Sequence, residues 1–73
     1  MNGLQECVEG LVYSAERLPN YAPWTTTLGE AIEACQTAPY HDAKQLEFIR
    51  RTFAIHGFTR EMTIEDARIH AKG

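Results

Sequence analysis

An unbroken helical periodicity opens the chain and limits what the rest of it can form. Apolar residues recur between Leu4 and Leu18 at intervals of one, three and four, at positions 4, 7, 8, 11, 12, 15 and 18. Such spacing places them on one face of an α-helix. Asn2 is a suitable N-cap, and Pro19 prevents the helix from continuing past Leu18. In a chain of 73 residues this pattern predicts one small helical domain.

A connector and a second helix follow. Residues 19–26 contain two prolines and no apolar period, so they are expected to form a loop. Thr27 and Glu30 have the spacing of a capping box, in which each side chain binds the other residue's backbone N–H. This signal predicts a helix of about ten residues that begins after Thr27 and ends before Pro39.

A third helix is predicted over residues 43–56. Asp42 offers its N-cap, and Gly57 has the position of a left-handed residue that ends a helix. Phe58 would then touch the last apolar turn, as in a Schellman motif. The expected apolar face is wide and includes Leu46, Ile49 and Phe53 with flanking Phe48 and Ile55.

The C-terminal residues give a weaker pattern with two competing starts, Thr59 and Thr63. Thr63 has Asp66 as its capping partner. The apolar stripe of Met62, Ile64, Ala67 and Ile69 predicts a fourth helix over about 64–71. The expected fold class is therefore all-α, a small single domain over residues 1–73 with three to four short helices around one core.

Charge is unevenly distributed along the chain. Residues 1–39 hold five glutamates against Arg17, a balance of −4, whereas residues 40–73 hold six basic against five acidic residues, a balance of +1. All three histidines lie in the second half. The asymmetry suggests two differently charged surfaces. The favoured alternative is that both are simply solvated helix faces, because runs of charge report solubility before partners.

Membrane and secretory classes are not indicated. The N-terminus has no basic region before an apolar stretch, and no apolar run approaches the roughly 20 residues of a membrane span. Two cysteines are too few for a disulfide scaffold. The expected compartment is the cytoplasm.

The residues do not form a recognisable catalytic set. Ser14 and Thr52 fall within predicted helices, and no nucleophile signature surrounds them. Cys7 and Cys35 take core-facing positions, where a thiol usually acts as a small apolar group. The glycines are scattered singly, so no phosphate-binding loop is present. We expect no enzymatic activity, no catalytic residue and no cofactor.

Metal binding is not supported by the histidine positions. His41, His56 and His70 have separations of 15 and 14 residues, which match no common ligand spacing. A distributed site that uses Cys35 and His41 stays open. His56 has a local explanation, because it falls in the last turn of the third helix, at the negative end of the helix dipole. We expect no metal.

Tyr21 and Trp24 are the first candidate partner-binding residues. They lie in the connector over residues 19–26, whose backbone is restricted by Pro19 and Pro23. Aromatic residues in a stiff loop are typical interface anchors, because docking then costs little entropy. The alternative is that Trp24 folds back as a lid over a small core.

Arg50 and Arg51 are the second candidate pair. Both fall on the solvent side of the third helix, where Glu47 is placed to pair with Arg51 and so neutralises only one of them. The alternative function is a DNA-binding regulator of helix-turn-helix type, with the turn at Gly57. Against it, Phe53 replaces the small residue expected four positions before the turn, and few basic residues follow.

The whole chain, from Met-Asn-Gly-Leu-Gln-Glu-Cys to Ala-Lys-Gly, resembles small phage-encoded proteins that bind the host RNA polymerase. The likeness is one of length and helical content. It implies a non-enzymatic transcription regulator in the host cytoplasm that inhibits initiation and promotes antitermination. The acidic half would suit a basic polymerase surface, and Arg50 with Arg51 would suit a position near RNA. The free protein is expected to be a monomer.

Overall fold

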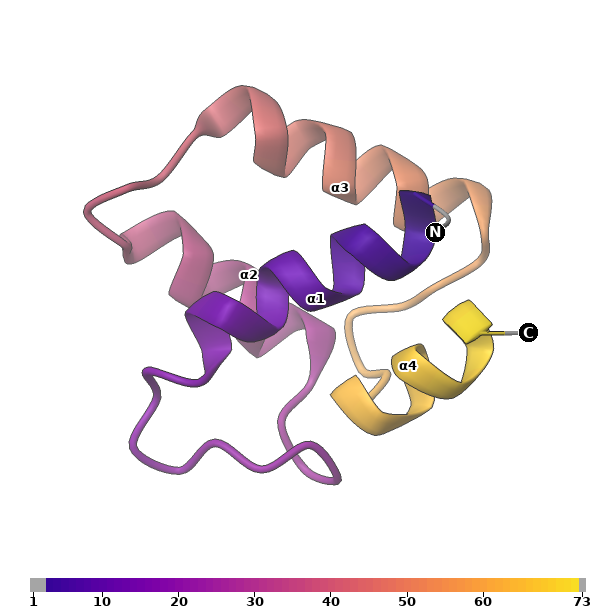
Figure 1. The fold of residues 1–73 in the computed structure, drawn as a ribbon, viewed down its shortest axis with the longest axis horizontal. Helices are drawn as coiled ribbons and strands as arrows, with labels where there is room; N and C mark the ends of the chain where they lie inside the picture. Colours follow the sequence, from indigo (N-terminus) through magenta and orange to yellow (C-terminus); the bar gives the residue numbers. More distant parts are fainter. Residues whose placement is uncertain (1–2, 73) are drawn as a thin grey trace.

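The computed structural model describes residues 3–72, which form four helices and no strand (Figure 1). The helices are α1 (Gly3–Ala15), α2 (Leu28–Thr37), α3 (Ala43–Ile55) and α4 (Ile64–Lys72). The predicted all-α fold class is thereby confirmed. The predicted cap at Asn2 lies outside the described residues. No helix within residues 3–72 has the length and apolar character needed to cross a membrane.

Helix α1 is the central element. It packs against each of the other three helices, and α2 also packs against α3. Figure 1 shows α3 and α4 on opposite sides of α1. The apolar stripe predicted from the sequence faces this core, where Val8, Leu11 and Ala15 are fully enclosed. Burying a large aliphatic side chain contributes about 1.5–3 kcal/mol, so this stripe is a main source of stability.

Helix α1 ends at Ala15, three residues before the predicted end at Leu18. The chain then tightens into a turn in which the N–H groups of Arg17 and Leu18 donate to the carbonyls of Ser14 and Ala15, at 3.2 and 2.9 Å. Leu18 still packs against the core from this turn. This tight turn satisfies the last carbonyls of α1. The helix therefore ends at Ala15, although its apolar period continues to Leu18.

Helix α2 has the predicted capping box. The Glu30 N–H donates to Thr27 Oγ1 at 3.2 Å, and the Thr27 N–H donates to Glu30 Oε1 at 3.0 Å. The helix has ten residues and ends at Thr37, two residues before Pro39. Both predicted ends are therefore confirmed.

The two ends of α3 are also as predicted. The Asp42 carboxylate accepts from the N–H groups of Lys44 and Gln45, at 3.0 and 3.3 Å. At the other end Gly57 has a φ of 76°, and the Phe58 N–H donates to the Phe53 carbonyl at 2.9 Å. The rings of Phe53 and Phe58 stack with their centroids 5.4 Å apart. This is the Schellman arrangement.

Helix α4 begins after Thr63, so of the two predicted starts Thr63 is confirmed and Thr59 is wrong. The Asp66 N–H donates to Thr63 Oγ1 at 3.2 Å. Arg68 then forms a two-pronged ion pair with Glu9 of α1, through Nε to Oε2 at 2.8 Å and Nη2 to Oε1 at 3.0 Å. This pair links the weakest predicted helix to the strongest one.

The two longer connectors, residues 16–27 and 56–63, are joined to each other and to the starts of α2 and α4. The N–H groups of Leu28 and Ile64 donate to the carbonyls of Met62 and Thr26, at 2.8 and 2.9 Å. These two bonds form an isolated antiparallel bridge between Thr27 and Thr63. Backbone groups that a loop would leave to water are satisfied here within the protein, so the connectors support the fold.

Replacing Gly57 by alanine is expected to lower the free energy of unfolding by about 1–2 kcal/mol, because a side chain is disfavoured at positive φ. The matched control is Gly10→Ala, in the exposed part of α1, where a new Cβ meets no heavy atom within 4 Å. This control should raise stability by about 0.5–1 kcal/mol. Urea unfolding followed by circular dichroism measures both changes. Equal effects of the same sign would contradict the assignment of Gly57.

The Glu9–Arg68 pair predicts a specific pH dependence. The hydrogen bond from Arg68 lowers the pKa of Glu9 below its ordinary 4.5. The pair therefore stabilises the fold above that pH, and the contribution is lost as the pH falls through the lowered pKa. Glu9→Gln should cost up to about 1 kcal/mol at neutral pH, since the pair is partly exposed, and much less at acid pH. Glu61→Gln is the control, and a pH-independent loss in Glu9→Gln would refute the assignment.

Candidate protein-binding surfaces

Some of the side chains that could act in catalysis lie near one another, because Ser14, Cys35, Tyr40 and Asp42 line one pocket. No group of three or more His, Cys, Asp or Glu residues within residues 3–72 could hold a metal ion. Cys7 is buried and burial raises the pKa of its thiol, whereas Cys35 is half-buried against the core. His41 is exposed on the connector before α3, and His56 is the C-cap of that helix. These two cysteines and two histidines therefore lie on four different parts of the fold: α1, α2, the connector before α3 and the end of α3.

Arg50 and Arg51 have different surroundings, although both are exposed on α3 as the sequence indicates. Arg51 is paired with Glu47 at 3.2 Å, as the spacing predicts. No ion pair joins Arg50 to any described residue, and its side chain lines the hollows between α2 and α3. Of the two arginines, Arg50 is therefore the one whose guanidinium could bind a partner without breaking an existing ion pair.

The outward face of α3 carries a stripe that we call the α3 crest, made of Lys44, Phe48, Arg51 and Ile55. Their spacing of four, three and four residues places them on one side of the helix. Phe48 is 59% exposed and Ile55 is 81% exposed. Two large apolar side chains are thus presented to solvent, Phe48 between Lys44 and Arg51 and Ile55 one turn beyond Arg51.

The position of Phe48 and Ile55 differs from the sequence expectation that they flank the core face. The core positions of α3 are Leu46, Ile49 and Phe53. At 100° per residue, Phe48 and Ile55 lie on the other side of the helix from Leu46 and Phe53. The sequence signal for this second apolar face is the spacing of four, three and four residues from Lys44 to Ile55, which is offset around the helix from the spacing of Leu46, Ile49 and Phe53.

Trp24 lies at the tip of a rigid connector and is 68% exposed, so it is not a lid over the core. The connector is braced by hydrogen bonds from the N–H groups of Thr25 and Thr26 to the Ala22 carbonyl, at 3.0 and 2.8 Å. Glu65 N–H of α4 also donates to the Pro23 carbonyl at 2.8 Å. An exposed aromatic ring on such a fixed backbone is suited to anchor a partner.

Tyr21 is half-buried and packs against the core, in contrast to Trp24. The two residues therefore have different roles within one loop. Tyr21 fastens the connector to the domain, and Trp24 projects from it. Partner contact by Tyr21 would be limited to its exposed edge.

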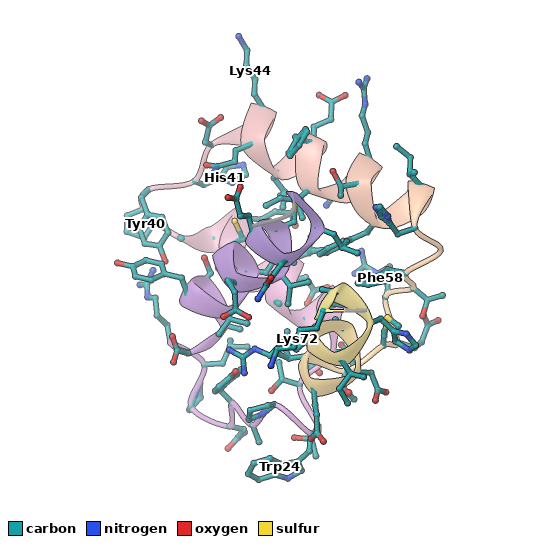
Figure 2. The ribbon with its side chains drawn as sticks, turned by 45° about the vertical axis from the view of Figure 1, so that its right-hand side comes forward. Trp24, Tyr40, His41, Lys44, Phe58 and Lys72 are labelled. Atoms are coloured by element: carbon teal, nitrogen blue, oxygen red, sulfur yellow. The ribbon has the colours of Figure 1, made fainter. Side chains whose placement is uncertain are left out.

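The structure does not bring the two predicted binding regions together. Figure 2 shows Lys44 of α3 at one end of the molecule and Trp24 at the other. The domain measures 30 × 27 × 21 Å. A single flat partner surface would touch either the α3 crest or Trp24, whereas a cleft in a large assembly would reach both.

An aromatic cluster that the sequence analysis did not single out holds the turn between α2 and α3. The rings of Tyr13 and Tyr40 meet edge to face at 5.6 Å, and the Arg17 guanidinium lies 5.6 Å from the Tyr40 ring centre. The Ser14 and Tyr40 hydroxyls are 3.3 Å apart, and this hydrogen bond, together with Arg17, lowers the pKa of Tyr40. The cluster attaches the turn to α1, which explains it without a ligand.

Helices α3 and α4 do not form the close pair of a helix-turn-helix motif. Each packs on α1, but they make no substantial contact with each other within residues 3–72. Phe53 is buried and stacks on Phe58 of the turn, and Phe58 in turn meets the His70 ring of α4 edge to face at 6.3 Å. The geometry therefore gives no specific support to a DNA-recognition helix.

Comparison with protein-family models gave no match, and neither the curated proteins nor the solved structures contain a significant relative of this chain.

Trp24→Ala is expected to change the free energy of unfolding by less than about 0.5 kcal/mol, since the ring is exposed. Tyr21→Ala, in the same loop, should cost more than about 1 kcal/mol because Tyr21 packs against the core. Thermal and urea unfolding measure the contrast. A large loss of stability in Trp24→Ala would show that the ring supports the core after all.

The two cysteines should differ in reactivity. Cys7 is buried with a raised pKa, so in the folded protein it is expected to react with a thiol reagent only through opening of the structure. Cys35 should react faster in the folded protein because it is half-buried. Each rate is measured in the variant in which the other cysteine is alanine. Rapid labelling of Cys7 under native conditions would contradict its burial.

Proposed function

We propose that this protein is a non-enzymatic, protein-binding regulator that docks through the α3 crest. The observation that carries the proposal is the exposure of Phe48 and Ile55, which alternate with Lys44 and Arg51 along one side of α3. The core of the fold does not need these two side chains, because α3 already buries Leu46, Ile49 and Phe53. An apolar patch with a charged border is the usual composition of a protein interface.

The size of the domain is compatible with this role. A standard interface buries about 800 Å² on each partner, which is about one sixth of the 4753 Å² surface of this protein. The α3 crest with its flanks supplies one continuous helical face for such a contact. Helix faces recognised through residues at i, i+4 and i+7 are a common mode of protein recognition.

The partner we propose is bacterial RNA polymerase, in keeping with the resemblance to small phage-encoded polymerase-binding proteins. In this proposal the free protein is a monomer in the host cytoplasm, inhibits initiation and promotes antitermination. Two features support a large partner. The exposed Trp24 and the α3 crest lie at opposite ends of the domain, and a cleft in a multisubunit assembly would contact both.

The direct test measures binding to purified bacterial RNA polymerase. The double variant Phe48→Ala/Ile55→Ala should weaken binding by about 30-fold or more, equivalent to the loss of an interface anchor of about 2 kcal/mol. The control is Ile69→Ala on α4, which removes an isoleucine that is 60% exposed outside the crest. Circular dichroism should show native helix content in both variants.

Two results would overturn parts of the proposal. Absence of polymerase binding by the unaltered protein would remove this partner. Equal losses in the crest variant and in Ile69→Ala would remove the α3 crest as the docking surface. If only Trp24→Ala weakened polymerase binding, the interface would lie at the opposite end of the domain instead.

The cations of α3 should act mainly on the rate of association. Arg50→Glu/Arg51→Glu is expected to slow association and to reduce its dependence on salt, while the helical signal stays native. Kinetics at several salt concentrations measure this effect. Unchanged binding at low salt would exclude both arginines. A salt-sensitive gel shift with duplex DNA alone would instead favour the DNA-binding alternative.

A further inference from the structure

A groove of about 220 Å³ lies between α2, the inner flank of α3 and the following connector. Its lining is mainly apolar, with two arginines and one threonine: Leu28, Ile32, Arg50, Phe53, Ala54, Phe58, Thr59 and Arg60. Arg50 and Ala54 separate this groove from the α3 crest, so a partner lying on the crest reaches the groove by crossing the flank of α3.

The groove is built into the fold. Phe58 is fixed at one side by its hydrogen bond to the Phe53 carbonyl and by the stacked rings. The connector that carries Arg60 is held to α2 by the Gly29 N–H, which donates to the Arg60 carbonyl at 2.9 Å. A preformed apolar site loses little conformational entropy when it is filled.

The charges around the groove have one predominant sign. Among its lining residues there are two guanidinium groups and no carboxylate. Arg60 forms an ion pair with Glu33 of α2, in which Nη2 and Oε1 are 3.6 Å apart and both side chains are largely exposed to solvent. Arg50 has no ion pair with a described residue. An occupant with a carboxylate would therefore gain its strongest interaction from Arg50.

The volume limits the apolar part of the occupant. An engineered cavity of about 150 Å³ accommodates benzene, so a groove of about 220 Å³ is suited to one aromatic or large aliphatic side chain. Carboxylates next to that side chain would lie at the rim, where guanidinium groups bind them through paired hydrogen bonds.

We propose that this groove binds an acidic segment of the partner protein that inserts one large apolar side chain between Arg50 and Arg60. The inference rests on the proposed protein-binding function and specifies the chemistry of the segment. Phe53 and Phe58 form the floor under the inserted side chain, and Arg50 binds the adjacent carboxylate.

The test uses short synthetic peptides with the isolated, full-length protein. The probe is a five-residue peptide with phenylalanine between pairs of acidic residues, and its matched control replaces every carboxylate by the corresponding amide. Amide chemical shifts are followed by NMR at low salt up to about 5 mM peptide, a range that detects millimolar affinity. We expect saturable shifts at the residues lining the groove, and about tenfold weaker binding of the amide peptide.

Two single substitutions distinguish Arg50 from its neighbour. Arg50→Gln should weaken binding of the acidic peptide about tenfold, because it removes the unpaired guanidinium. Arg51→Gln should leave the affinity unchanged, because Arg51 lies on the α3 crest and pairs with Glu47. Ala54→Trp, at an exposed position of the lining, should fill the groove and abolish binding while the fold is retained.

The outcomes separate this inference from the proposed function. If no shifts arise at the groove, or if Arg50→Gln and Arg51→Gln weaken the peptide equally, the inference is wrong. In that case a loss of polymerase binding in the Phe48→Ala/Ile55→Ala variant would still support the proposed function. Peptide binding at the groove without any polymerase binding would support the acidic segment and reject the proposed partner.

Discussion

Burial of the apolar face of α1 is the interaction on which the rest of the structure depends. The other three helices all pack on this face, and α3 and α4 have no comparable contact with each other. Val8, Leu11 and Ala15 are consequently enclosed on every side. A small chain buries a limited fraction of its surface, so a single central helix is an effective way to give each short helix a partner.

This arrangement leaves α3 with two distinct faces. One face is committed to α1 and α2, and the other carries Phe48 and Ile55 into solvent. If folding were the only requirement on the sequence, polar residues at these two positions would make the protein more soluble. These exposed side chains lie next to the guanidinium of Arg50, which forms no ion pair with a described residue, and to the apolar groove that Arg50 lines; these features support the proposed binding.

The connectors are as important for the surfaces as the helices. Hydrogen bonds between residues 16–27 and 56–65 fix the loop that carries Trp24, and those between the start of α2 and residues 60–62 fix the rim of the groove. The backbone that carries Trp24 and the rim of the groove is therefore held by hydrogen bonds within the protein, which in the proposed binding would reduce the entropy lost.

The sequence by itself determined the four helices, because the capping residues Thr27, Asp42 and Thr63 and the terminating Gly57 act through neighbours within a few residues. It also determined the Glu47–Arg51 pair, which is local for the same reason. The spacing within α3 separates its apolar residues into two faces, but only the tertiary structure decided which of these faces is left in solvent, that Trp24 projects outward, and that Arg50 lies beside a groove. These features depend on where α1, α2 and the connectors pack, and contacts between residues distant in the chain leave no local pattern from which to predict them.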